Sequence, residues 1–376
     1  MRTKHTIFAV LAAIFLVLAV NPVSEGVDTK AIDAVRNKAV LDSKDRQIID
    51  DFVAQAVAEL VKTKDFTSVS RVRSIILRKK SPQPQYAAQF SSSARKYISL
   101  GFEQASKLNS ESRQFRAMLN LLILLDGLED LQLVDLATER LNDANTSICY
   151  WAVHSITNAG ITEQLNADPA ANTKLAVQIV QALEKQLDRC SPEVLPMMVE
   201  FAGAVKVGQA EGLLLRIADI RIKQYAEWTV ENELMDIAIL EALFNKIPSG
   251  RTGKSAVARR FAQLYSYAIQ RYYIGRDFLT DKQKQHLISV LVETEASHIS
   301  KLLGEPPQLT VKIRRALERN DYTALLLEHN RILGDKTREG QLSLKLKFDY
   351  GQNSDGTKRI EPLALSKPPS KMVSKD

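Results

Sequence analysis

Hydrophobic residues recur every three or four positions through most of the chain, which is the spacing of amphipathic helices. Between 43 and 60, for example, Ile49, Phe52, Val53 and Ala56 fall on one stripe. The same spacing predicts further helices near 66–80, 84–107, 112–126, 129–142, 146–158, 172–188, 192–205, 209–225, 229–247, 253–274, 280–303, 308–319 and 321–333. Short polar segments separate them, as between antiparallel neighbours. The pattern predicts an all-α body.

The C-terminal part has a different pattern. Residues 341–350 alternate strictly between apolar and polar side chains, which is typical of a strand. The turn-rich stretch 351–357 leads to 358–365, where a returning strand is predicted. Because a lone hairpin is only marginally stable in water, we expect its apolar face to close the end of the helical body. Alternatively, its edge adds to the sheet of a partner.

Part of the helical region repeats internally. The stretch LNDANTSICYWAVHSITNA from Leu141 aligns with LDRCSPEVLPMMVEFAGAV from Leu187 at an offset of 46 residues, and a shifted third copy begins at Leu108. Each copy holds the end of one helix, a polar turn and a second apolar helix. One helix pair cannot bury its apolar face alone, so the copies are expected to stack on one another.

The stretch LATERLNDANTSICYWAVHSITNAG, residues 136–160, resembles the HEAT/armadillo family of helical repeats. Ala152 lies where that family favours a small residue, although Cys149 or Tyr150 replaces its usual Arg. The resemblance implies an α-solenoid of antiparallel helix pairs, a HEAT-like superhelix. The alternating C-terminal residues add the small β-hairpin at its end.

The predicted domain organisation has four parts. They are a signal peptide (1–26), an α-helical repeat domain (27–334), a C-terminal β-hairpin cap (335–365) and a disordered tail (366–376).

The N-terminus has the pattern of a secretory signal. Arg2 and Lys4 precede an unbroken apolar run from Ile7 to Val20, and small residues allow cleavage near Gly26. The run is shorter than the roughly 20 residues of a spanning helix, although an uncleaved anchor is the alternative. No other run approaches that length, so the mature protein is expected to be exported, periplasmic or extracellular, with no transmembrane span.

The stretch IPSGRTGKSA ends like a phosphate-binding loop, with Lys254 after Gly253. The first glycine of that motif is replaced by Pro248, which offers no N–H to a phosphate. A helix is also predicted to enter the turn where the motif requires a strand. We therefore expect no nucleotide at this turn.

Other candidate chemistry is sparse. The histidines, such as His286 and His298, lack the spacing of metal ligands, so neither a metal nor any other cofactor is expected. No signature of nucleophilic catalysis occurs. The repeat alignment separates Cys149 from Cys190 by more than the reach of a disulfide, so unpaired thiols are predicted. A disulfide between them, formed in an oxidising compartment, is the alternative.

The formal net charge is +7, and two stretches, 66–102 and 249–276, contain basic but no acidic residues. Aromatic residues are interleaved in both. Either these are solvated outer helix faces, or they form an anion- or partner-binding surface. The candidate residues for that surface are Arg71, Arg73, Arg78, Lys79, Lys80, Arg95, Lys96, Arg259, Arg260, Arg271 and Arg276.

The leading hypothesis is an exported helical-repeat binding or scaffold protein of the cell envelope without catalytic activity. Its partner would be another protein or an anionic envelope component, and nucleic acid is not expected for an exported protein. The alternative is an exported (α/α)-toroid enzyme acting on an anionic polysaccharide. Such an enzyme would need paired carboxylates in a cleft and tryptophan platforms for the sugar, and the sequence has only Trp151 and Trp228.

Overall fold

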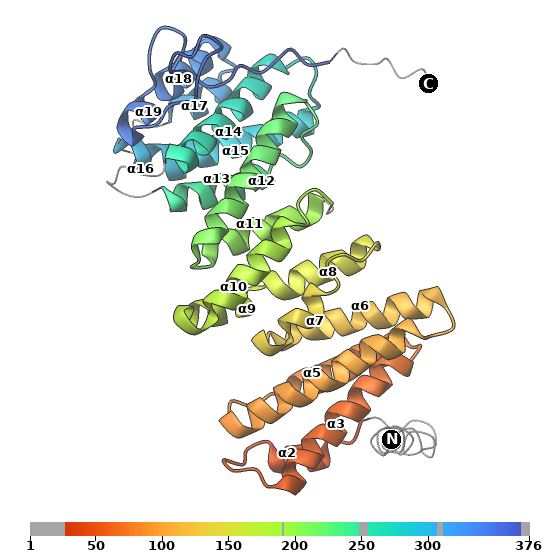
Figure 1. The fold of residues 1–376 in the computed structure, drawn as a ribbon. Coiled ribbons are helices and arrows are strands. Elements are labelled where there is room, and N and C mark those ends of the chain that lie inside the picture. Colours follow the sequence, from red (N-terminus) through yellow and green to blue (C-terminus); the bar gives the residue numbers. More distant parts are fainter. Residues whose placement is uncertain (1–26, 190–191, 248–254, 307–310, 370–376) are drawn as a thin grey trace, which may run out of the picture. The chain divides into compact units, whose positions relative to one another are not determined.

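The computed structural model describes residues 27–189, 192–247, 255–306 and 311–369. The regular structure in these ranges is helical, which confirms the prediction of an all-α protein (Figure 1). None of the helices described there is long and apolar enough to cross a membrane. The predicted signal peptide lies outside the described residues.

The protein divides into two compact units with the boundary after Leu128, inside the single repeat domain that the sequence predicted. The first unit contains α2 (Lys30–Val35), α3 (Ser43–Lys62), α4 (Phe66–Arg78), α5 (Pro84–Ser106) and α6 (Glu111–Leu128). Helix α3 packs on α5 and α6, and α4 packs on α3 and α6. The predicted stripe of α3 is buried in this core.

The second unit begins with η1 (Leu131–Leu133), α7 (Val134–Thr138), α8 (Thr146–Thr157), α9 (Ala159–Ala167), α10 (Pro169–Glu184), η2 (Pro192–Val194), α11 (Leu195–Ala204) and α12 (Gly208–Ala226). It continues with α13 (Met235–Lys246), α14 (Ser255–Ile274), α15 (Asp281–Thr294), the π-helical turn η3 (Glu295–Ile299), α16 (Ser300–Leu303), α17 (Lys312–Glu318), α18 (Tyr322–Leu333) and α19 (Gln341–Leu346).

Helices in this unit pack on near neighbours in the sequence. Helix α11 contacts α8, α12 and α13, and α12 contacts α10 and α14. Figure 1 shows α11 to α14 following one another in space as they do in the sequence. Positions paired by the 46-residue offset, such as Val153 and Val199, are fully buried in both copies.

The predicted strand over 341–350 is wrong at its start, because Gln341–Leu346 forms helix α19. Leu342 is fully buried whereas Leu344 is 59 % exposed, so alternate residues do not share one face. Helix α19 packs on α16 and α18, and this tertiary contact overrides the local alternation. Lys347, with φ at 54°, ends the helix in the left-handed conformation.

The turn-rich stretch does reverse the direction of the backbone. The N–H of Tyr350 donates to the main-chain oxygen of Arg359 at 3.1 Å, and Gln352 and Lys358 form one antiparallel bridge. Between 341 and 369, however, the described residues include no β-strand. The alternation of residues 341–350 therefore does not produce the predicted hairpin strand.

Beyond this turn, the C-terminal segment is held against α14 through its backbone. Gln263 exchanges two hydrogen bonds with the backbone of Leu363, and Gln270 accepts one from the N–H of Leu365 at 2.6 Å. The indole N–H of Trp228 donates to the oxygen of Ser366 at 3.1 Å. Ser366, which the sequence placed in a disordered tail, is thus part of the packed structure.

The conformation of Lys347 gives a test that separates helix from strand. A lysine in the left-handed region is strained by roughly 1–2 kcal/mol, and glycine is not. We expect Lys347→Gly to raise the free energy of unfolding by up to about 1 kcal/mol, whereas in a strand glycine would lower it by about as much. Both tryptophans lie in the second unit, so their fluorescence during urea unfolding reports the change.

The matched control is Leu344→Gly, at an exposed position inside α19. There glycine should destabilise by about 1 kcal/mol. A loss of stability in Lys347→Gly as well would contradict the helix end at this residue.

Candidate partner-binding site

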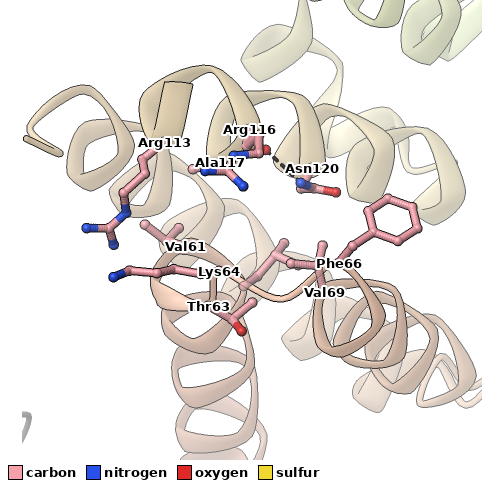
Figure 2. Close-up of a pocket in the computed structure, with 10 residues that line it drawn as sticks. Val61, Thr63, Lys64, Phe66, Val69, Arg113, Arg116, Ala117 and Asn120 are labelled. Atoms are coloured by element: carbon pink, nitrogen blue, oxygen red, sulfur yellow. Dashed lines mark hydrogen bonds between the residues drawn. The ribbon is translucent and has the colours of Figure 1, made fainter. Parts of the chain in front are cut away.

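In the first unit, the corner between α3 and α4 faces the start of α6 across a pocket of about 130 Å³. Its apolar walls are buried side chains from three helices: Leu60, Val61, Val69 and Ala117. Its polar and aromatic lining is Thr63, Lys64, Phe66, Arg113, Arg116 and Asn120. Figure 2 shows Lys64 and Arg113 on one side of this pocket and Phe66 on the opposite side.

The local sequence explains why Lys64 and Phe66 reach the rim. Helix α3 ends at Lys62, and Asp65 caps α4 by accepting a hydrogen bond from the N–H of Ser68 at 2.6 Å. Hydrogen bonding from Ser68 also lowers the pKa of Asp65, so the capping carboxylate stays ionised. The short turn between the helices leaves Phe66 77 % exposed.

Three cations surround the pocket. Among the described residues, Lys64, Arg113 and Arg116 form no ion pair, and Arg116 Nε donates only to the main-chain oxygen of Ser112 at 3.2 Å. The side chains of Lys64 and Arg113 extend toward the same side (Figure 2). Because like charges repel, an anion bound between them would be stabilised. We call the pocket the basic pocket. Its walls are the four apolar residues, and its rim is the polar and aromatic lining of Thr63, Lys64, Phe66, Arg113, Arg116 and Asn120.

The first predicted basic stretch lies entirely in this unit, on α4, on α5 and between them. Its exposed members are Arg71, Arg78, Lys80, Arg95 and Lys96. Arg73 is half-buried, and burial lowers its pKa. The sequence thus identified the unit that carries the pocket but none of the pocket's own cations.

Some of these predicted cations are engaged by other parts of the unit. Lys79 forms an ion pair of 2.7 Å with Asp33, and Lys96 lies 3.8 Å from Asp50. The ammonium of Lys80 donates to the main-chain oxygen of Leu128 at 2.6 Å. They help to hold α2, α3 and α6 as well as carrying charge.

The second predicted stretch is in the second unit, and two of its arginines are paired with acids far away in the sequence. Arg259 binds both the carboxylate and the main-chain oxygen of Asp349, at 2.8 and 2.6 Å. Arg260 makes a bidentate contact with Asp219, with both distances 2.8 Å. A stretch of sequence without acidic residues can therefore still have acidic side chains around it in the folded protein.

Arg271 corrects the expectation that it points to solvent, because its side chain is 1 % exposed. The guanidinium lies 3.4 Å from the buried carboxylate of Glu233 and 5.3 Å from the ring of Trp228. Burial lowers the pKa of Arg271. The sequence did carry a signal: Arg271 continues the apolar stripe three residues after Ala268.

Arg276 has a different environment from Arg271. It is exposed, lies 3.5 Å from Asp277 and stacks over the ring of Tyr322 at 5.5 Å. Of the eleven predicted residues, seven lie in the first unit and four in the second.

The remaining candidates form no site within the ranges that the structure describes. A helix, α13, precedes the turn that resembles a phosphate loop, as predicted, while residues 248–254 of that turn lie outside the described ranges. Cys190 lies outside them too. Within the described ranges, no cluster of His, Cys, Asp and Glu could hold a metal ion. Trp228 is buried and its N–H is occupied, so it is not a sugar platform.

No protein-family model and no curated protein matches this sequence. A solved crystal structure of an engineered protein is similar at 12 % identity, covering 86 % of this protein and 96 % of its own length, with a TM-score of 0.28. A score this low carries no argument about fold or function.

The burial of Arg271 can be tested by comparing it with Arg260, which lies on the same helix and pairs with Asp219 near the surface. Arg271→Met leaves the carboxylate of Glu233 buried without the guanidinium, so we expect a loss of about 3 kcal/mol in the free energy of unfolding. Arg260→Met removes a partly exposed pair and should cost less than about 1 kcal/mol. Urea unfolding followed by tryptophan fluorescence measures both. Equal, small losses would contradict the buried position of Arg271.

Proposed function

We propose that this protein binds an anionic partner and that the basic pocket of the first unit is its recognition site. The observation that carries the proposal is the group of three cations, Lys64, Arg113 and Arg116, around apolar walls, with no carboxylate of the described residues paired to them. The proposed role is binding or scaffolding without catalysis.

The predicted arginines of α14 are already paired, and this supports the choice of the basic pocket as the site. Arg259, Arg260 and Arg271 already have carboxylates of the same protein at 2.8–3.4 Å. An anionic ligand there would have to replace an existing partner. At the basic pocket, a ligand carboxylate would displace no carboxylate of the described residues. The partly exposed cations there can donate charge-assisted hydrogen bonds to it.

We further propose that the protein is exported, that its helix pairs stack as HEAT-like repeats, and that the C-terminal segment closes one end of the array. The apolar run before Pro22 supports export. Paired burial at the 46-residue offset supports the repeats. The backbone contacts of Leu363 and Leu365 with α14 support the closing role. An array of this kind would present the partner-binding surface as a scaffold.

Export has a direct test. Because a signal peptidase would cut after the small residues that follow the apolar run, we expect natively expressed protein to begin near Val27. Mass spectrometry of the purified protein and its cell fraction measures this. Protein that keeps Met1 in the cytoplasmic fraction would contradict export.

The proposed site is tested by reversing charge at matched positions. We expect Arg113→Glu/Arg116→Glu to weaken binding of fluorescent poly-L-glutamate by more than about tenfold, because two attractive contacts become repulsive. Wild-type binding should also weaken from about 50 to about 300 mM NaCl, since salt screens exposed charges beyond about 8 Å. Fluorescence anisotropy of the full-length protein reports both effects.

The control is Lys44→Glu/Arg46→Glu, which changes the net charge equally on the same unit. Both residues are exposed in the first turn of α3, roughly 20 Å along the helix from Leu60. The control should reduce binding only slightly. Equal losses in the two variants would mean that net charge, and not the pocket, attracts the anion; the proposal would then fail.

A further inference from the structure

The basic pocket has apolar walls as well as cations, and a simple anion would leave those walls unused. Leu60, Val61, Val69 and Ala117 are each at most 5 % exposed, yet they border the open space between α6 and the α3–α4 corner. Phe66 adds a ring to one side of the opening (Figure 2). Apolar walls with a few polar groups at the rim are the common composition of a ligand pocket.

From this arrangement we infer that the partner is an acidic protein segment that inserts one apolar side chain into the pocket. The inference rests on the proposed function and names the class of partner. The cavity of about 130 Å³ is close to the roughly 150 Å³ that holds a benzene molecule. One leucine- or phenylalanine-sized group therefore fits, and two do not.

The rim determines where the acids of that segment lie. Lys64 and Arg113 reach out on the side opposite Phe66, and Arg116 stands on α6 between the two sides (Figure 2). Carboxylates on one side of the inserted residue would meet these cations, while Phe66 covers the inserted group from the other side. The ligand is thus asymmetric, with its acids grouped on one side of an apolar anchor.

Two uncharged rim groups suit a peptide backbone. The amide nitrogen of Asn120 donates to the oxygen of Arg116 at 2.7 Å, and its side-chain oxygen accepts no hydrogen bond in the described structure. The hydroxyl of Thr63 likewise has no partner there. Between them they can accept a hydrogen bond from one peptide N–H and donate one to a peptide carbonyl.

The shape of the pocket favours a protein segment over the other anionic candidates. A concave site receives a protruding group, whereas a bilayer offers a broad surface of headgroups. An acidic polysaccharide would supply carboxylates but no branched or aromatic side group to fill the apolar space. Only a peptide combines the two features with backbone groups for Thr63 and Asn120.

The test uses the full-length protein and three fluorescent nine-residue peptides. The first has three glutamates on one side of a central leucine, the second replaces the leucine by alanine, and the third replaces the glutamates by glutamines. Burying a leucine side chain should make the first peptide bind at least about tenfold more tightly than the second. Loss of the charges should weaken the third peptide by a similar factor.

Two variants test whether the preference for the leucine peptide arises at the pocket. Ala117→Leu fills the space from α6 and should bring the affinities of the leucine and alanine peptides together. Phe66→Ser, at a position that is 77 % exposed and contributes little to the core, should reduce the leucine preference several-fold. This second variant decides the question if Ala117→Leu does not fold.

The outcomes separate the two proposals. If the leucine and alanine peptides bind equally in the wild type, the inserted side chain is refuted and the anion-binding function stands. If no acidic peptide, no poly-L-glutamate and no anionic vesicle binds, both are refuted. If vesicles containing phosphatidylglycerol bind through Arg113 and Arg116 while the peptides do not, the partner is a membrane and the inference is wrong.

Discussion

The apolar stripe of an amphipathic helix must be buried, and in the described structure other helices provide the surface that buries it. Helix α3 uses α5 and α6, and α12 uses α10 and α14. Once these contacts are made, the polar faces and the helix ends are left to carry everything else. The basic pocket lies where such helix ends meet, at the corner between α3 and α4.

The same helix packing determines whether a cation is paired with an acid, buried or exposed. Where the packing brings an acid from a distant helix, as with Asp219 beside Arg260, the arginine serves the fold. Where the stripe itself includes an arginine, as at Arg271, the charge is buried with Glu233 and stacked on Trp228. Where a corner opens with no acid of the described residues paired to its cations, as at Arg113, positive charge remains for a partner.

Periodicity was sufficient for much of the fold. It predicted α3 to α6 and most of the helices in the second unit, because an apolar stripe that repeats every three or four residues is specific to an amphipathic helix. It failed at α19, where Leu342 is buried and Leu344 is not. There the alternation was a local coincidence, and contacts with α16 and α18 determined the conformation.

The site was less accessible to sequence reasoning. The acid-free stretch 66–102 lies in the same unit as the basic pocket but contains none of its cations. Lys64 and Arg113 are far apart in the sequence and line one pocket because α6 packs against the α3–α4 corner. The partners of Arg259 and Arg260 are likewise distant in sequence. Arg271 could have been found, since its spacing places it on the buried stripe of α14.

The central claim is that an anionic partner is recognised at the basic pocket and nowhere on α14. Hydrogen–deuterium exchange of the full-length protein, with and without a saturating acidic peptide, locates the contact directly. The account predicts slower exchange in residues 60–69 and 111–120, with no change in 255–274. Protection confined to 255–274, or to the C-terminal segment that lies on it, would contradict the account.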